Sequence, residues 1–170
     1  MGIIPSVVSR PPAPVACRIN GERLALVAWL RAILLQLAHP LVAAAVDDHS
    51  SFSAGTWQAI GRLRHTVGAM LAVTFGTDEE YQRALAGIQA IHRRVRGAER
   101  GVPYSADDPV LLLWVHATLV DSLVRVHDRL VDPLTEGERD AFCQESAAFA
   151  IALGATDTAV PRTWASMERY

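Results

Sequence analysis

Apolar positions recur with a helical period along nearly the whole chain. They fall three and four residues apart, the spacing of one face of an α-helix, in segments 22–38, 57–75, 78–96, 109–131 and 136–154. Two shorter helices are expected at 40–46 and from Pro161 to the chain end. No segment shows the strict alternation of a confident strand. The pattern predicts an all-α fold: one helical domain, 21–170, of six to seven helices, after a flexible proline-rich lead-in at 1–20.

Residues that begin and interrupt helices support these boundaries. Asp108 stands where an N-cap is needed, and Thr135 with Glu138 has the spacing of a capping box. The residue before a proline disfavours helical geometry, so His39 before Pro40 is expected to break the chain between two helices.

Composition narrows the class of protein. The chain has 170 residues, 51% hydrophobic and 20% charged, which fits one globular domain with a real core. A net charge of −2 argues against binding nucleic acid through phosphate contacts.

Two cysteines in no zinc or disulfide pattern predict a cytoplasmic location. The absence of lysine beside abundant alanine is typical of a high-GC bacterial genome. The apolar run 24–38 is short for a membrane span and contains Arg31, so we expect a core helix and no transmembrane segment.

A small set of polar residues lies on apolar helix faces. On segment 78–96, one stripe consists of Tyr81, Leu85, Ile88, His92 and Val95. Segment 57–75 has a second stripe with Arg62 and Thr66, and His65 lies beside it. Antiparallel packing of the two helices would place these groups at one apolar cavity. The simpler reading of His92 alone is a hydrogen-bonded core histidine.

Helices 109–131 and 136–154 add further polar groups. His116 and His127 are eleven residues apart and share a face, and Glu145 lies between two phenylalanines. A buried carboxylate needs a partner, so Glu145 is expected to pair with a histidine or an arginine, Arg62 included. We expect His39 to serve a helix break, His49 a cap or a turn, and His127 a helix end. Spacing alone therefore stops at a buried polar pocket with a candidate axial histidine.

Six segments, in order, resemble the family of the mycophenolic-acid pathway oxygenase and the latex-clearing rubber oxygenases. They are LLQLAHPLVAAAVDDHSSF, RLRHTVGAMLAVTFGT, IHRRVRG, YSADDPVLLLWVHATLVDSL, PLTEGERDAFCQE and PRTWASMERY. The likeness covers about residues 21–170. It implies an all-helical oxygenase domain whose globin-like core holds haem b and which uses O2 on a small apolar substrate, including alkene-containing ones. It also implies that this chain stops before the last helices of its relatives.

The resemblance assigns site residues by motif. His92 matches the histidine that binds the haem iron in the rubber oxygenases, and Arg62 and Thr66 match an R-x-x-x-T motif that lines the haem pocket. Those enzymes have a lysine just before the threonine, able to occupy the sixth iron position. This chain has His65 there, and a neutral imidazole can also bind iron. Two alternatives remain open: a non-catalytic or truncated helical module that binds haem, an apolar ligand or a partner, and a haem sensor or carrier. A homo-oligomer is compatible with either.

Overall fold

The computed structural model describes residues 13–49 and 56–170, with the backbone alone for residues 56–65. In chain order the helices are α1 (Pro14–Gly21), α2 (Ala25–Gln36), α3 (Pro40–His49), α4 (Thr56–Phe75), α5 (Asp78–His92), α6 (Pro109–Leu130), α7 (Glu136–Leu153) and α8 (Trp164–Arg169). The two strands are β1 (Arg96–Glu99) and β2 (Val102–Ser105), and a 3₁₀ turn, η2, spans Asp157–Ala159. The all-α prediction is confirmed for these residues, apart from the small hairpin.

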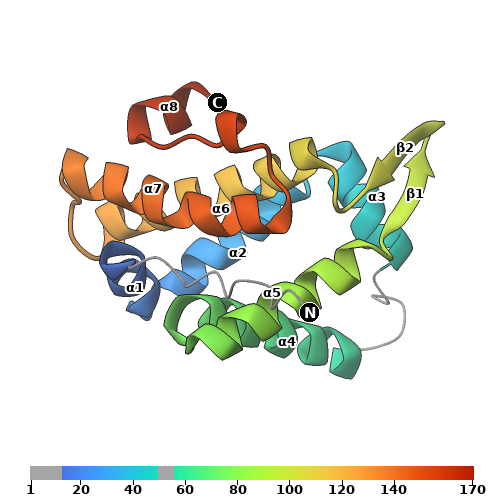
Figure 1. The fold of residues 1–170 in the computed structure, drawn as a ribbon, viewed down its shortest axis with the longest axis horizontal. Coiled ribbons are helices and arrows are strands. Elements are labelled where there is room, and N and C mark those ends of the chain that lie inside the picture. The colour runs from blue at the N-terminus through green and yellow to red at the C-terminus, as the bar shows by residue number, and fades with distance from the viewer. Residues whose placement is uncertain (1–12, 50–55) are drawn as a thin grey trace, which may run out of the picture.

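Helix α6 is the centre of the fold. It packs on α2 and α7, while α4 and α5 form an antiparallel pair on one side and α8 lies on the other (Figure 1). Three alanines, Ala25, Ala28 and Ala32, are buried along one face of α2, and their small side chains let that helix approach α6 closely. Arg31 adds a polar tie, because it donates to Asp121 at 2.7 Å and to Ser122 at 2.8 Å on α6.

The opposite face of α2 is apolar and exposed. Its exposed side chains are Leu26, Val27, Leu30, Ile33, Leu34 and Leu37. By length and composition, α6 could span a membrane, and so could the bent pair of α2 and α3, but 61% of the apolar window of α6 is buried inside the protein. That burial is what a core helix requires, so α6 is accounted for without a membrane.

Residues 14–20, expected to be part of a loose lead-in, form helix α1. Pro14 occupies the first turn, where its missing N–H costs no hydrogen bond. Ile19, only 1% exposed, anchors α1 in the main core. Residues 1–12 of the expected lead-in lie outside the described part of the chain.

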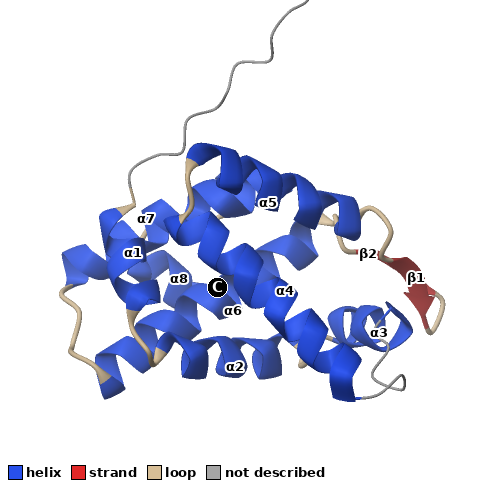
Figure 2. Ribbon diagram, turned by 90° about the horizontal axis from the view of Figure 1, so that it is seen from below, coloured by secondary structure: helices blue, strands red, loops and turns tan. Residues whose placement is uncertain are grey.

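The hairpin corrects two sequence expectations. Helix α5 ends at His92, not near Arg96, and β1 and β2 replace an expected loop. The turn between them is Arg100-Gly101, with φ of 49° and 82°. Positive φ at both central residues is typical of a tight hairpin turn, although asparagine is more usual than arginine at the first position. Figures 1 and 2 show the hairpin at one end of the molecule, beside α3.

Other helix ends follow the sequence more closely. Asp108 caps α6, and Thr135 with Glu138 forms the expected capping box of α7. The last helix begins at Trp164, after a cap by Thr163, and not at Pro161. The reason is that Val160 and the residues after it run in extended geometry before the helix starts.

Candidate functional site

His92 is the last residue of α5 and the centre of the candidate site. Its side chain is half-buried, and its Nδ1 atom is buried with no hydrogen-bond partner within the described residues. Burial lowers the pKa of His92, and the Asp107 carboxylate opposes this shift only in part. The ring is therefore neutral near pH 7, and a neutral imidazole keeps a lone pair for a metal ion.

The chain just after His92 is held by the hairpin and by α3. The Tyr104 hydroxyl donates to Asp48 of α3, which raises the pKa of Tyr104 to about 12. Nε2 of His49, at the end of α3, lies 3.1 Å from the Arg96 carbonyl oxygen of β1. These contacts fix the loop that follows His92, so the ring sits on a restrained backbone.

Helix α4 packs antiparallel against α5, as the short connection between them predicts. The side chains of Arg62 and His65 lie outside the described part of the structure, so their place beside His92 stays a prediction. Thr66 is exposed, whereas Ala69 and Val73 on the same stripe are half-buried. The stripe is thus packed only in the second half of α4.

Two further histidines have unpartnered buried nitrogens. In the part of the chain that the structure describes, neither Nδ1 of His39 nor Nε2 of His116 has a hydrogen-bond partner. The centre of the His39 ring lies 5.8 Å from the centre of the Trp114 ring, at the break between α2 and α3. Sequence reasoning placed His39 at that break but expected it to form a hydrogen bond there. No sequence signal distinguishes an unpartnered buried histidine from a paired one.

Other polar residues have structural roles. His127 was expected at a helix end, and its Nδ1 lies 2.7 Å from the Asp132 carbonyl oxygen just beyond α6. Among the described residues, the partners of Glu145 are backbone groups and not the expected histidine or arginine, and the side chain of Arg62 lies outside this part of the structure. The carboxylate accepts hydrogen bonds from the backbone N–H groups of Ala16 at 2.7 Å and Val15 at 3.4 Å. A helix N-terminus exposes unpaired N–H groups, so α1 supplies these donors.

The donor set around His92 bears on the kind of metal centre it can hold. Among the described residues, no three His, Cys, Asp or Glu side chains cluster to bind an ion together. A porphyrin supplies four nitrogens and leaves axial positions for one or two imidazoles, which fits a lone neutral histidine.

Comparison with known proteins identifies the family. The model for "ER-bound oxygenase mpaB/B′/Rubber oxygenase, catalytic domain" matches residues 18–170. An uncharacterized protein of Mycobacterium tuberculosis and one of Mycobacterium bovis are each 34% identical over 116 residues, which is 67% of this chain and 46% of each relative. The chain thus spans about half the length of these curated relatives. No solved structure was found to match it. The match along nearly the whole chain confirms the resemblance: the protein belongs to the mpaB/rubber oxygenase catalytic-domain family.

Proposed function

We propose that this chain is a haem b-binding oxygenase domain that uses O2 on a small apolar substrate, with His92 as an axial ligand of the iron. The observation that carries the proposal is the buried, neutral and unpartnered ring nitrogen of His92 in a chain of an oxygenase family. Hydrogen bonding to a buried polar atom is the rule in proteins, so an unpartnered one suggests a missing ligand.

Bound haem b would supply an iron centre at which O2 is activated for oxidation of the substrate. The chain's residues have the other tasks. His92 would donate a lone pair from a ring whose backbone the hairpin restrains. The guanidinium of Arg62 suits a haem propionate, because its planar fork matches a carboxylate. Thr66 would line the pocket, and His65 would compete for the sixth iron position.

The substrate class follows from the apolar surroundings and from the family resemblance. Segment 66–75 of α4 contains no charged residue. A haem held between α4 and α5 would lie against this apolar helix, which would exclude water and would favour a hydrocarbon over an ionic substrate. An alkene is the class that the resemblance to the rubber oxygenases suggests.

The absorption spectrum tests the haem proposal. The full chain, expressed with added haem precursor, should show a Soret band that moves on reduction. His92→Ala should remove or strongly shift that band. The matched control is His127→Ala, because His127 lies at the end of α6 with its Nδ1 on the Asp132 carbonyl oxygen, and its loss should leave the spectrum unchanged. If His39→Ala removes the Soret band and His92→Ala leaves it in place, then His39 binds the iron and the proposal for His92 is wrong.

A second function is favoured by the exposed apolar face of α2: a non-catalytic module that binds a partner or an apolar ligand. An exposed patch of five large apolar side chains on one helix, with Leu37 just beyond its end, is unusual for an isolated domain. Oxygen consumption separates the two functions. Sustained O2 uptake with an alkene by the haem-loaded chain supports the oxygenase. Haem binding without uptake, together with concentration-dependent self-association, supports the module.

A further inference from the structure

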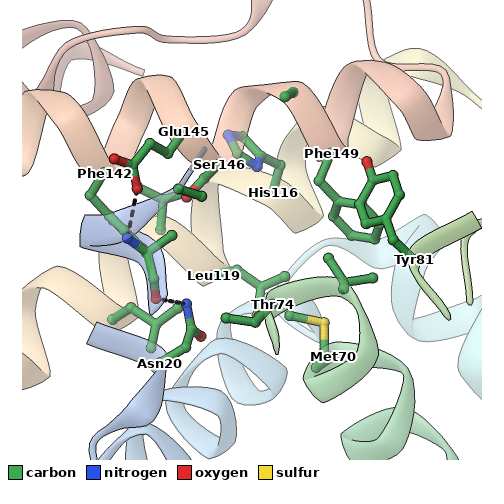
Figure 3. A pocket seen from close by; sticks show the side chains of 16 residues that line it. Asn20, Met70, Thr74, Tyr81, His116, Leu119, Phe142, Glu145, Ser146 and Phe149 are labelled. Carbon is green, nitrogen blue, oxygen red and sulfur yellow. Dashed lines mark hydrogen bonds between the residues drawn. The ribbon is translucent and has the colours of Figure 1, made fainter. Parts of the chain in front are cut away.

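A cavity lies at the other end of the α4–α5 pair from His92. It has a volume of about 90 Å³ and is lined by residues of α4, α5, α6 and α7 together with α1 and the residue before it (Figure 3). His92 is not among its lining residues, so it is separate from the candidate iron site. A water molecule takes up about 30 Å³ of liquid, and an engineered apolar cavity of about 150 Å³ binds benzene. This cavity therefore suits an organic molecule smaller than benzene.

His116 is the main polar group of the cavity. Its side chain is only 7% exposed and lies among the lining side chains in Figure 3. Burial lowers the pKa of His116 to about 4, so the ring is neutral at pH 7. Within the described residues its Nε2 atom has no hydrogen-bond partner. A buried ring nitrogen of this kind gains from any ligand that brings one hydrogen bond.

Asn20 presents a second polar atom to the cavity. Its amide nitrogen donates to the Ala16 carbonyl oxygen at 2.9 Å, which leaves the side-chain oxygen facing inward. That oxygen is buried and, in the described part of the chain, has no partner. The cavity therefore offers one fixed acceptor on Asn20 and one nitrogen on His116.

Charge decides the class of ligand. Glu145 is the single charged side chain among the described residues that line the cavity, and it already accepts from the N–H groups of Val15 and Ala16. An anion would lie near Glu145 with no cation to offset it, and a cation would lose its water for a carboxylate that is already occupied. The ligand must be neutral.

A hydroxyl suits His116 in either tautomer. It can donate to a bare Nε2 or accept from Nε2–H. A ketone or an ether only accepts hydrogen bonds, so it could bind only the tautomer that carries hydrogen on Nε2. The rest of the ligand must be apolar, because Met70, Leu119 and Phe149 form much of the wall.

We propose that this cavity is a binding site for a small neutral alcohol, with its hydroxyl on His116 and its carbon body against Met70, Leu119 and Phe149. Isobutanol, with five non-hydrogen atoms, is a suitable probe. A ligand of this size is expected to bind with a Kd on the order of 1 mM.

Nuclear magnetic resonance of the full isotope-labelled chain tests the proposal. Isobutanol should produce saturable shifts in the His116 ring signals and in the α6 amides. His116→Leu should weaken binding at least five-fold, and His116→Gln, which keeps a hydrogen-bonding side chain, should restore much of it. His49→Leu is the matched control, since His49 is exposed and outside the cavity.

Ala148→Met supplies an independent test, because it would fill the cavity while His116 remains. It should abolish the saturable shifts without unfolding the chain. Shifts that grow linearly with isobutanol, or that saturate equally in His116→Leu and Ala148→Met, would overturn the proposal. The first result means a solvent effect, and the second means binding elsewhere, such as on the exposed face of α2. An absence of shifts would mean that the cavity holds water alone.

Discussion

Glu145 on α7 holds the N-terminus of α1, with its Oε2 atom 2.7 Å from the backbone nitrogen of Ala16. The two residues are 129 positions apart in the sequence. The carboxylate caps free N–H groups and lies at the positive end of the helix dipole. It therefore joins the first helix to the core through hydrogen bonds from backbone N–H groups.

Removing this carboxylate should destabilise the chain. Glu145→Ala leaves partly buried N–H groups without this acceptor, and we expect a loss of about 1–3 kcal/mol in the free energy of unfolding. Glu145→Gln keeps an oxygen acceptor and should lose less. Urea denaturation of both variants gives the comparison. Equal stability of Glu145→Ala and the unchanged chain would mean that the contact contributes nothing.

How far the sequence predicts the fold depends on how local each signal is. The capping box of Thr135 and Glu138 spans four residues, and its prediction is confirmed. Helix α1 could not be predicted, because its stability depends on Glu145, far away in the sequence. The hairpin was missed because Arg100-Gly101 is an unusual pair for a turn with positive φ at both positions.

The candidate site also combines features that local sequence patterns predict with features that depend on contacts between distant residues. Helical periodicity placed His92 on a packed face of α5, and the structure shows it half-buried. Periodicity cannot say whether a buried nitrogen finds a partner, because that depends on every element packed around it. For this reason the unpartnered state of His39 and His116 emerged only from the structure.

Gly97 allows the hairpin to fold against the ring of Tyr104. A Cβ atom built at this glycine would lie 2.3 Å from the Tyr104 hydroxyl oxygen, and Tyr104 is fixed by its bond to Asp48. Gly97→Ala should therefore cost about 1–3 kcal/mol of stability through overpacking. The matched control is Gly87→Ala in α5, where a Cβ would meet no atom within 4 Å.

The control substitution, Gly87→Ala, should change the free energy of unfolding in the opposite direction. Alanine in a helix interior is favoured over glycine by about 0.5–1 kcal/mol, so Gly87→Ala should stabilise the chain. Denaturant unfolding measures both changes. If the two substitutions shift stability in the same direction, the contact between Gly97 and Tyr104 is not the cause.

The neutral His116 ring predicts a loss of stability in acid. Its pKa falls from 6.5 to about 4 in the folded chain because of burial. Between these values the unfolded chain binds a proton that the folded chain does not, so stability falls as the pH falls. This residue alone should lower the free energy of unfolding by up to about 1.4 kcal/mol for each pH unit. Unfolding free energies at pH 7, 6 and 5 should show a steeper decline for the unchanged chain than for His116→Gln, and equal declines would contradict the prediction.

His65 predicts a coordination change at the iron. If its imidazole occupies the sixth position, the ferric protein should have a six-coordinate spectrum that becomes five-coordinate in His65→Ala. Imidazole added to that variant should restore the original spectrum, because it replaces the missing side chain. Arg64→Ala is the neighbouring control. A five-coordinate spectrum in the unchanged chain would show that His65 does not reach the iron.

The exposed face of α2 predicts binding of hydrophobic molecules. Leu30 and Leu34 are 58% and 71% exposed on the face that turns away from α6. The double variant Leu30→Glu, Leu34→Glu should lower the binding of a hydrophobic fluorescent dye and any self-association. Stability should change little, because exposed leucines contribute little burial. Leu130→Glu, 57% exposed at the end of α6, is the control for adding a charge elsewhere. Dye binding and sedimentation that respond equally to all the substitutions would mean that the α2 face is no distinct interaction surface.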